Sequence, residues 1–431
     1  MSHIRTFSAM VLLVSLFLIF FYSTLHLETT YSHKATPEDL PEHPSLQVQV
    51  LDSDVITQSS KQESVTVPQP DVDVVENVTV SEDFRRTIPQ NRGYWNRLLY
   101  SALTNLDKGE NPFRHHSNWS HCKETNQELL RTNMHDFNSY PDLFQDFVEG
   151  MDCRNSPVVL NQPRKCIAGG REAGNQTLLL FGIKSIPGHF EQRQALRETW
   201  GREGIYQNGQ RVRTVFLMGS PKEDDPDLSI LLSFEARHFG DILQWDFHES
   251  FLNLTLKMNV FLQWTLQHCP HVTFVFSGDD DVFVNTPLLL SYLQSLDSSK
   301  ASKLYVGDVI STASPLRDPK SKYFIPLSFY DGPYPAYAGG GGFVISGALL
   351  KPLYSVSHII PFYPIDDVYT GTCFKAIGVS PEAHRGFHTF DIKKEDREYL
   401  CAHKELILTH QRSPQQIKKL WRGIHSPLLT C

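Results

Sequence analysis

The chain has 431 residues, of which 40% are hydrophobic and 20% are charged, so it is long enough for one large or two ordinary globular domains. Its formal net charge of −8 is uneven, because residues 28–83 hold twelve acidic residues against two lysines and the remainder therefore carries +2. A nearly neutral folded part argues against a nucleic acid as partner, since proteins bind such polymers through basic surfaces.

The most apolar segment is residues 7–25, which contains no charged side chain. A helix of that length spans the hydrocarbon core of a bilayer. Arg5 precedes the segment and Glu28 follows it, so the positive-inside rule favours a cytoplasmic tail over residues 1–6 and a body outside the cytosol. A cleaved signal peptide is the alternative, but its apolar region is usually shorter and ends in small residues. We therefore expect a single uncleaved transmembrane helix at 7–25.

Two segments separate the anchor from the main fold. Residues 26–90 are rich in Pro, Ser, Gln, Val and acidic residues and show no helical period. Such a composition cannot bury enough apolar surface to offset the entropy lost on folding, which predicts a disordered stem. Residues 91–176 contain amphipathic stretches and three cysteines, and we expect them to form a disulfide-tied lead-in to the main fold.

The cysteines and glycosylation sequons both indicate an oxidising, non-cytosolic compartment. No two cysteines form a C-x-x-C pair, so zinc is not suggested. Seven cysteines in such a compartment would pair and leave one over, with a connectivity that spacing does not reveal. Four sequons of the form N-x-[ST] support the same placement. The cysteines are Cys122, Cys153, Cys166, Cys269, Cys373, Cys401 and Cys431, and the sequon asparagines are Asn77, Asn118, Asn175 and Asn253.

From residue 177 onward, short apolar runs alternate with helical patterns, which predicts an α/β domain over 177–431. Such alternation indicates a mixed, mostly parallel sheet with flanking helices. Ligands bind these sheets beyond the carboxyl ends of the strands, so Lys184 and Asp279 should face one crevice. The expected strands are 177–183, 213–218, 241–245, 272–276, 304–309 and 406–410, and the expected helices are 190–200, 228–239, 252–268 and 368–378.

Three aspartates lie between two apolar runs in the stretch FVFSGDDDVFV at 274–284, where we expect a Ser-Gly turn to end the first run. Carboxylates beside a core need a cation or a hydrogen-bond network. Asp279 and Asp281 are two residues apart and share one face of an extended backbone. Two hard oxygen donors at a strand end suit Mg²⁺ or Mn²⁺ carrying a diphosphate. The alternative is an acidic surface turn without a ligand.

Arg193 and Arg197 lie four residues apart in the helix expected at 190–200, so they share a face. One interpretation is a solvated helix face, which is common for such pairs. The other is a pair of cations near a helix start that faces a phosphate or uridine pocket. The spacing leaves both interpretations open.

An aromatic-rich segment containing Tyr323, Tyr330, Tyr334 and Tyr337 precedes four glycines at 339–342. Glycine lets the backbone approach a ligand without an intervening side chain. The segment lacks the lysine of a phosphate loop and does not lead from a strand into a helix, so neither nucleotide-loop motif fits. Aromatic faces beside a wall of glycines suit a sugar ring.

A second acidic pair, Asp366-Asp367, opens the helix expected at 368–378. We expect one aspartate to cap the helix and the other to point into the crevice as a base. His410 ends the last expected strand. A lone histidine there is more often structural than a ligand, and it becomes a metal ligand only if the sheet brings it to the acidic triplet.

Six motifs in this order resemble the inverting β-1,3-glycosyltransferases, a family of Golgi type II membrane proteins. The resemblance covers 177–431 strongly and the lead-in more loosely. The tetraglycine and the IDDVYTG form are most similar to the β-1,3-N-acetylglucosaminyltransferase branch, whereas the galactosyltransferase branch more often shows EDVYVG at the second site. The motifs are RQALRETW (193–200), FLNLTLK (251–257), GDDDVFV (278–284), Gly307-Asp308, AGGGG (338–342) and PIDDVY (364–369).

This resemblance implies a GT-A fold, Mn²⁺ as cofactor, and inverting transfer of N-acetylglucosamine from UDP-GlcNAc to a terminal galactose of a glycan in β-1,3 linkage. It implies that Asp281 and His410 bind the metal, that Asp367 is the base, that Asp279 contacts the ribose side of the nucleotide and that Asp280 faces the donor sugar. It also implies a luminal catalytic domain at the Golgi membrane, and leaves open a homo-oligomer or a hetero-oligomer with other glycosyltransferases. The residues that would bind the donor are Lys184, Arg193, Arg197, Asp279, Asp280, Gly341 and Gly342.

Three other functions remain open at this point. A β-1,3-galactosyltransferase would use UDP-Gal through the same residues. A sugar-binding protein without catalysis would have no reason to keep Asp281, Asp367 and His410 together. A metal-dependent phosphoesterase would need a second metal site, and the sequence contains no further cluster of ligands for one.

Overall fold

The computed structural model describes residues 79–87, 93–110, 119, 122–123, 127–167, 177–206, 209–221, 225–390 and 392–431. All of these belong to one compact unit, Pro68–Cys431. The tail and anchor expected over residues 1–25, most of the stem expected over 26–90, and Asn77, Asn118 and Asn175 lie outside the described residues. Among the described helices, none combines the length and the apolarity that a membrane crossing requires.

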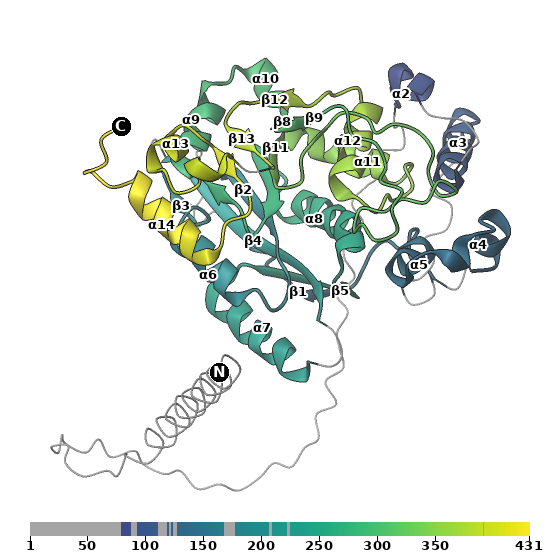
Figure 1. The fold of residues 1–431 in the computed structure, drawn as a ribbon, viewed down its shortest axis with the longest axis horizontal. Coiled ribbons are helices and arrows are strands. Elements are labelled where there is room, and N and C mark those ends of the chain that lie inside the picture. The colour runs from purple at the N-terminus through teal and green to yellow at the C-terminus, as the bar shows by residue number, and fades with distance from the viewer. Residues whose placement is uncertain are drawn as a thin grey trace, which may run out of the picture. The chain divides into compact units, whose positions relative to one another are not determined.

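A nine-stranded mixed sheet forms the centre of the described fold (Figure 1). Its order is β1-β5-β4-β2-β6-β11-β8-β12, with β3 paired to β4. The neighbours β5, β4, β2 and β6 run parallel, whereas β11 is antiparallel to both β6 and β8. The strands are β1 (Val158–Leu160), β2 (Thr177–Lys184), β3 (Gly204–Ile205), β4 (Arg211–Ser220), β5 (Ile242–His248), β6 (Phe274–Asp279), β8 (Tyr305–Gly307), β11 (Gly342–Ser346) and β12 (Glu382–Ala383).

Two smaller sheets lie beside the main one. The first orders as β13-β14-β7 and the second pairs β10 with β9. The α/β class with a parallel sheet centre, expected from the alternation of strands and helices, is confirmed. The strands of the smaller sheets are β7 (Phe283–Val284), β9 (Val309–Ile310), β10 (Tyr337–Ala338), β13 (Phe387–His388) and β14 (Leu408–Thr409).

Helices cover both faces of the main sheet. Figure 1 shows α6 and α14 together on one side of the sheet, and α8, α11 and α12 together on the other. The helices are α2 (Glu82–Thr87), α3 (Tyr94–Asp107), α4 (Gln127–Asn133), α5 (Asp142–Glu149), α6 (Phe190–Glu198), α7 (Pro226–Phe239), α8 (Leu254–His268), α9 (Thr286–Ser295), α10 (Ser298–Ser302), α11 (Leu350–Ser357), α12 (Asp366–Ala376), α13 (Leu400–Lys404) and α14 (Pro414–Ile424).

Each face of the sheet carries its own hydrophobic core. Successive residues of β2 alternate between them: Leu180 packs into the core of α8, α11 and α12, while Leu179 and Phe181 pack into the core of α6, α9 and α14. A strand that is covered on both faces needs apolar residues at every position. That requirement explains the continuous apolar run at 178–181.

The acidic triplet differs from its expected geometry in one respect. Ser277 and Gly278 do not form a turn but continue β6, which runs to Asp279. Gly278 pairs with Gly342 of β11, and a side chain on Gly278 would collide with the ring of Phe276. Glycine is therefore needed here for close packing between strands, and the turn falls three residues later than expected, at Asp280 and Asp281.

The segment before the main sheet packs against the fold at two places. Cys166 forms a disulfide with Cys269, directly after α8. Ser81 caps the end of α12, because its N–H donates to the carbonyl of Ala376 (2.7 Å) and its hydroxyl to the carbonyl of Lys375 (2.8 Å). Helix α2, which Ser81 precedes, lies within the range expected for the stem.

Two more disulfides complete the pairing. Cys122 pairs with Cys153 inside the lead-in, and Cys401 pairs with Cys431 at the carboxyl end. Cys373, buried in α12, is the free cysteine. The expectation that one of the seven would remain unpaired is confirmed.

Candidate active site

A cleft of about 550 Å³ lies at the carboxyl ends of β2 and β6. The two strands run parallel in register, so that Lys184 pairs with Asp279 and both end at the same edge of the sheet. Both residues line the cleft, together with Gly341, Asp367 and His410. The crevice expected from the strand order is therefore confirmed, and it contains residues from four distant parts of the chain.

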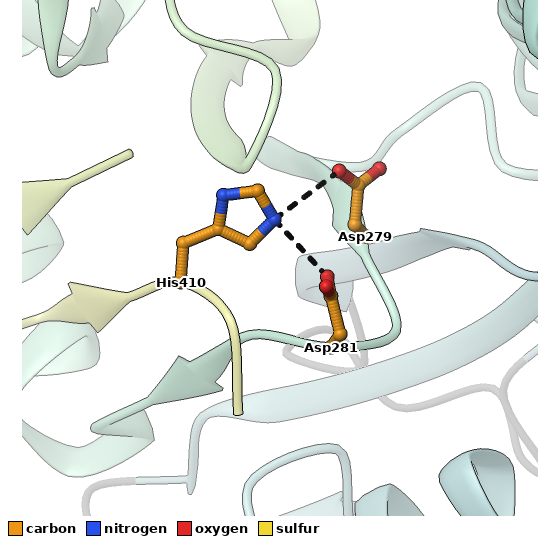
Figure 2. Close-up of side chains that lie close together, drawn as sticks. All are labelled: Asp279, Asp281 and His410. Atoms are coloured by element: carbon orange, nitrogen blue, oxygen red, sulfur yellow. Dashed lines mark hydrogen bonds and ion pairs between the residues drawn. The ribbon is translucent and has the colours of Figure 1, made fainter. Parts of the chain in front are cut away.

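Asp279, Asp281 and His410 form a cluster that could hold a metal ion (Figure 2). One ligand atom from each lies within 4.8 Å of the other two. Nε2 of His410 is 3.1 Å from Oδ1 of Asp281 and 3.8 Å from Oδ2 of Asp279. Two carboxylates and an imidazole are a suitable donor set for Mn²⁺. His410 reaches the triplet because β14, directly before it, pairs with β7, directly after the triplet.

A backbone contact fixes the ring of His410. Nδ1 lies 2.7 Å from the carbonyl oxygen of Thr389, so this nitrogen carries a proton and donates it. Nε2 is thereby left facing the two carboxylates, as a metal ligand would be. Burial alone would lower the pKa of His410, but the hydrogen bond and charge of Asp281 raise it above its usual value.

Lys184 is buried at the centre of the cleft wall and joins its two acidic groups. Its Nζ lies 3.0 Å from Oδ1 of Asp279 and 2.9 Å from Oδ2 of Asp366, and donates to the carbonyl of Gly340 over 3.2 Å. Burial alone would lower the pKa of Lys184, but the two carboxylates raise it above the usual value. The ammonium group therefore stays charged and keeps both acidic groups in place.

Asp367 lies in the first turn of α12 and lines the cleft. Its Oδ2 accepts from the N–H of Gly340 (3.0 Å) and its Oδ1 from the N–H of Val368 (2.8 Å). Burial, and next the negative charge of Asp366, raise the pKa of Asp367 to about 7. A carboxyl group that titrates near neutral pH is suited to take a proton from a substrate hydroxyl.

Asp366 takes the structural role expected for one member of the pair, although not as a helix cap. Ile365 occupies the cap position of α12, and the Asp366 side chain turns instead to Lys184. The negative charges of both aspartates lie in the first turn of α12, where the helix dipole favours them.

The tetraglycine segment divides into residues with different roles. Gly340 and Gly341 line the cleft, and the carbonyl of Gly341 accepts from the N–H of Asp279 (3.3 Å). A side chain on Gly341 would meet Thr389 at 2.8 Å and His410 at 3.1 Å. Gly342 does not line the cleft: it lies in β11, and a side chain there would strike Leu408 at 2.4 Å. Its expected role in donor binding is therefore corrected to close packing.

Asp280 does not face the cleft, contrary to the role that the resemblance implied. Its carboxylate points into the protein, where Oδ2 accepts from the hydroxyl of Ser185 (2.6 Å) and contacts Nδ1 of His189 (2.9 Å). Asp280 lies in the turn directly after β6, and these contacts direct its side chain away from the metal cluster. Asp280 therefore ties the acidic turn to the loop that follows β2.

Arg193 and Arg197 also lie away from the cleft. The guanidinium of Arg193 is fully buried and pairs with Glu235 of α7 (2.6 Å), and Arg197 pairs with Glu235 (2.7 Å) and Asp241 (2.7 Å). Neither a solvated face nor a phosphate pocket describes this arrangement. Arg193 also donates to the carbonyls of Ile186 (2.7 Å) and Pro187 (3.0 Å), so it holds the loop after Lys184 instead of the donor.

Part of the cleft wall is aromatic. Tyr323, Tyr334 and Tyr337 line it with Phe251, whose ring meets that of Tyr323 edge to face at 5.2 Å. The aromatic and glycine surfaces predicted to surround a sugar ring thus line one cleft. Of the four sequon asparagines, Asn253 is the one that the structure describes, and it lies two residues after Phe251. Its side-chain amide donates to the carbonyl of His248 (2.9 Å).

Sequence reasoning missed Thr389 and Phe390 as cleft residues, and it did not distinguish Gly340 from the other three glycines. Gly340 was one of four equivalent glycines, and only the fold shows that its N–H and carbonyl serve Asp367 and Lys184 respectively. Thr389 and Phe390 lie in a loop without a motif. No sequence signal distinguishes them, because their position depends on the pairing of β13 with β14.

Comparisons with known proteins identify relatives of this chain. A model of the galactosyltransferase family matches residues 191–385. The chain is 44% identical over 356 residues to N-acetyllactosaminide β-1,3-N-acetylglucosaminyltransferase 2 of Mus musculus, covering 79% of this chain and 86% of that protein. Its identity to the Homo sapiens protein of the same name is 42% over 369 residues, covering 83% of this chain and 90% of that protein.

A third relative, acetylgalactosaminyl-O-glycosyl-glycoprotein β-1,3-N-acetylglucosaminyltransferase of Mus musculus, is 41% identical and covers 68% of this chain and 76% of its own. The solved structure of a glycosyltransferase involved in the glycosylation of the major capsid of PBCV-1 is 15% identical, covering 56% of this chain and 98% of that chain. Its TM-score of 0.33 is too low to establish a shared fold. The identity to the curated relatives over most of both chains shows that this chain belongs to the β-1,3-glycosyltransferase family of enzymes, in its β-1,3-N-acetylglucosaminyltransferase branch.

Proposed function

We propose that this enzyme transfers N-acetylglucosamine from UDP-GlcNAc to the 3-hydroxyl of a terminal galactose on a glycan acceptor, with inversion at the anomeric carbon. The names of the relatives support the donor and the linkage. The structural observation that carries the proposal is that Asp367 lines the same cleft as Asp279 and His410. A base and a candidate metal cluster then serve one substrate pair in the same cleft.

Asp367 is the base in this proposal. Its carboxylate takes the proton of the acceptor 3-hydroxyl while that oxygen attacks the anomeric carbon, and the bond from this carbon to the diphosphate oxygen breaks. One displacement converts the α-linked donor to a β-linked product, so no second carboxylate is required as an acid. The N–H groups of Gly340 and Val368 hold the carboxylate in place during the proton transfer.

The metal cluster forms the donor end of the proposed site. When bound to Asp281 and His410, with Asp279 beside them, Mn²⁺ would act as a Lewis acid that stabilises the charge of the departing UDP. The fixed Nε2 of His410 and the exposed carboxylate of Asp281 fit such an ion. Lys184 keeps Asp279 and the Asp366-Asp367 pair in register across the cleft, because its ammonium contacts both acidic groups.

The finer features of the resemblance enter the same proposal. We infer a GT-A fold, a type II anchor at 7–25 with a cytoplasmic tail at 1–6, and a luminal catalytic domain in the Golgi. The three disulfides fit an oxidising lumen. The proposal also includes N-linked glycans at Asn77, Asn118, Asn175 and Asn253. It further includes a homo-oligomer or an assembly with other glycosyltransferases.

A donor panel tests the proposal. The full-length enzyme, purified in detergent, is incubated with Mn²⁺, a lactose-type acceptor and one UDP-sugar at a time, and the product linkage is read by NMR. We expect UDP-GlcNAc to be used in preference to the others and the new linkage to be β-1,3. Preferential use of UDP-Gal would instead identify the galactosyltransferase alternative, and no transfer from any UDP-sugar would refute both.

A further inference from the structure

A second cavity of about 170 Å³ lies beside the cleft. Phe84 of α2 and Leu99 of α3 form its outer wall, and one face of α12 forms its inner wall. Tyr334 and Val368 line both this cavity and the catalytic cleft, so the two spaces are neighbours separated by these two side chains. Helix α2, from the range expected for the stem, and helix α3, from the lead-in, thus contribute to a cavity next to the base.

The walls of the second cavity are mainly aromatic. The ring of Trp95 meets those of Tyr330 (5.4 Å) and Tyr363 (5.5 Å) edge to face, and Tyr334 meets Tyr363 at 5.8 Å. Edge-to-face packing of this kind gives rigid apolar surfaces. Rigid walls are pre-organised for a ligand, because little side-chain freedom is lost when it binds.

The polar atoms of these walls are largely engaged within the protein. Nε1 of Trp95 donates to the carbonyls of Pro361 and Phe362, the hydroxyl of Tyr330 donates to Pro333, and the hydroxyl of Thr372 donates to Val368. A free sugar ring, with hydroxyls on every side, would lose hydrogen bonds to water here without replacing them. The cavity is therefore suited to a small, mainly apolar group.

One polar anchor lies at the junction of the two spaces. The hydroxyl oxygen of Tyr334 accepts from the hydroxyl of Tyr363 (3.1 Å), which leaves the proton of Tyr334 for donation to a ligand. An amide carbonyl attached to a methyl group would match an anchor at the entrance and an apolar interior. The acetamido group of a sugar has this chemistry.

The position of the cavity assigns it to the acceptor side. Val368 directly follows the base, and Val368, Thr372 and Lys375 recur at helical spacing along one face of α12, over about 10 Å. The metal-cluster residues do not line this cavity. A galactose whose 3-hydroxyl meets Asp367 would direct the rest of the acceptor away from the donor, along this side of α12.

We propose that the second cavity binds an apolar substituent that the acceptor carries beyond its terminal galactose. The group is either the acetamido group of an adjoining N-acetylglucosamine or the hydrocarbon part of an aglycone. This inference rests on the proposed function, because it presumes a galactose-terminated acceptor at Asp367. It gives helices α2 and α3 a role in selecting acceptors.

Matched acceptors test the proposal on the full-length enzyme with saturating UDP-GlcNAc and Mn²⁺. The first pair is lactose and N-acetyllactosamine, which differ by the acetamido group. The second pair is methyl and octyl β-galactoside, which differ in hydrocarbon length. Burial of one methyl group changes affinity by about fourfold, so we expect at least that ratio of KM within the preferred pair. Equal KM values within both pairs would overturn the proposal.

Variants then locate the effect. Leu99→Phe fills the cavity from α3 and should abolish the KM ratio while leaving the kinetics on methyl β-galactoside unchanged. Leu103→Phe enlarges a buried leucine of the same helix that does not line the cavity, and should keep the ratio. Thr87→Phe, at an exposed position on the cavity rim, repeats the test with little risk to folding, and Arg86→Phe is its control.

The outcomes separate the two proposals. A ratio that survives both Leu99→Phe and Thr87→Phe, or that disappears equally in the two controls, would refute the assignment of this cavity. Failure of the proposed function would take a different form, because the wild-type enzyme would then transfer N-acetylglucosamine to no galactoside at all.

Discussion

The N–H of Gly340 donates a hydrogen bond to Oδ2 of Asp367 over 3.0 Å. The same glycine accepts from Lys184 through its carbonyl, so one peptide segment connects the proposed base to the lysine that pairs with Asp279. The base is thereby positioned by main-chain groups, which substitutions other than proline retain, and by the absence of a side chain at residue 340.

Gly340→Ala should therefore misplace the base. An added methyl carbon would lie 3.3 Å from Oδ2 of Asp367, close enough to push the carboxylate by a few tenths of an ångström. We expect kcat to fall by about 10- to 100-fold with a smaller change in KM for UDP-GlcNAc, because near-attack geometry is sensitive to such shifts. Gly204→Ala, where an added methyl meets open space, is the control and should keep wild-type rates.

Asp367→Asn should abolish transfer but leave UDP-sugar binding intact. An amide cannot take the proton from the 3-hydroxyl of the sugar acceptor. The loss of a general base typically reduces the rate by about 10²- to 10⁴-fold. Titration calorimetry with UDP-GlcNAc and Mn²⁺ measures the binding. Loss of binding together with activity would show that Asp367 serves the donor and not the acceptor.

The pH profile should report the same carboxyl group. Burial and the charge of Asp366 raise the pKa of Asp367 to about 7, and the protonated form cannot act as a base. At saturating Mn²⁺, kcat/KM should fall with decreasing pH below about 7, by tenfold per pH unit, and level off above it. Asp366→Asn removes the neighbouring charge and should move this limb to lower pH. A limb that moves to higher pH in this variant would contradict the assignment of the limb to Asp367.

Alanine substitutions at Asp281 and at its neighbour Asp280 should have different effects on UDP binding and on stability. Asp281→Ala is expected to weaken Mn²⁺-dependent UDP binding at least tenfold with little change in melting temperature, because this side chain is half exposed. Asp280→Ala leaves Ser185 and His189 without their shared acceptor and should lower stability by about 1–3 kcal/mol. Calorimetry and thermal unfolding of both variants separate the roles, and unchanged UDP affinity in Asp281→Ala would count against metal ligation.

Glu235→Ala tests whether Arg193 and Arg197 are structural. The substitution leaves the buried guanidinium of Arg193 without its carboxylate, and breaking a buried ion pair in this way typically costs about 3–5 kcal/mol. The melting temperature should fall sharply, while KM for UDP-GlcNAc, measured below the transition, should stay near wild type. Glu191→Ala, at an exposed position of α6, should change stability by no more than about 0.5 kcal/mol. A selective rise in donor KM in Glu235→Ala would restore a role for these arginines at the site.

The parts of the fold that the sequence predicted are those fixed by local pattern. Strand β2 is covered on both faces, so its apolar run is continuous and recognisable. The meeting of Lys184 with Asp279 followed from the rule that parallel strands end at one edge of the sheet. These inferences needed no knowledge of what packs against each element.

The errors came where a partner distant in sequence decides the role of a side chain. Helical spacing placed Arg193 and Arg197 on one face, but it could not show that α7 supplies Glu235 to that face. The resemblance likewise assigned Asp280 to the donor, whereas the side chain meets Ser185 and His189 on the opposite side of the strand. Motif similarity identifies which residues are required, but it does not say on which side of the backbone each one acts.

The contact between Ser81 and the end of α12 bears on where the chain could be cut between the proposed anchor and the folded unit. Ser81 satisfies the last carbonyls of the helix whose first turn contains Asp367. A protease that cuts upstream of Val80 would separate the proposed anchor from the folded unit and leave this helix cap in place. A cut near residue 90, where composition alone ends the stem, would remove the cap and one wall of the second cavity, and would release a protein with altered acceptor use.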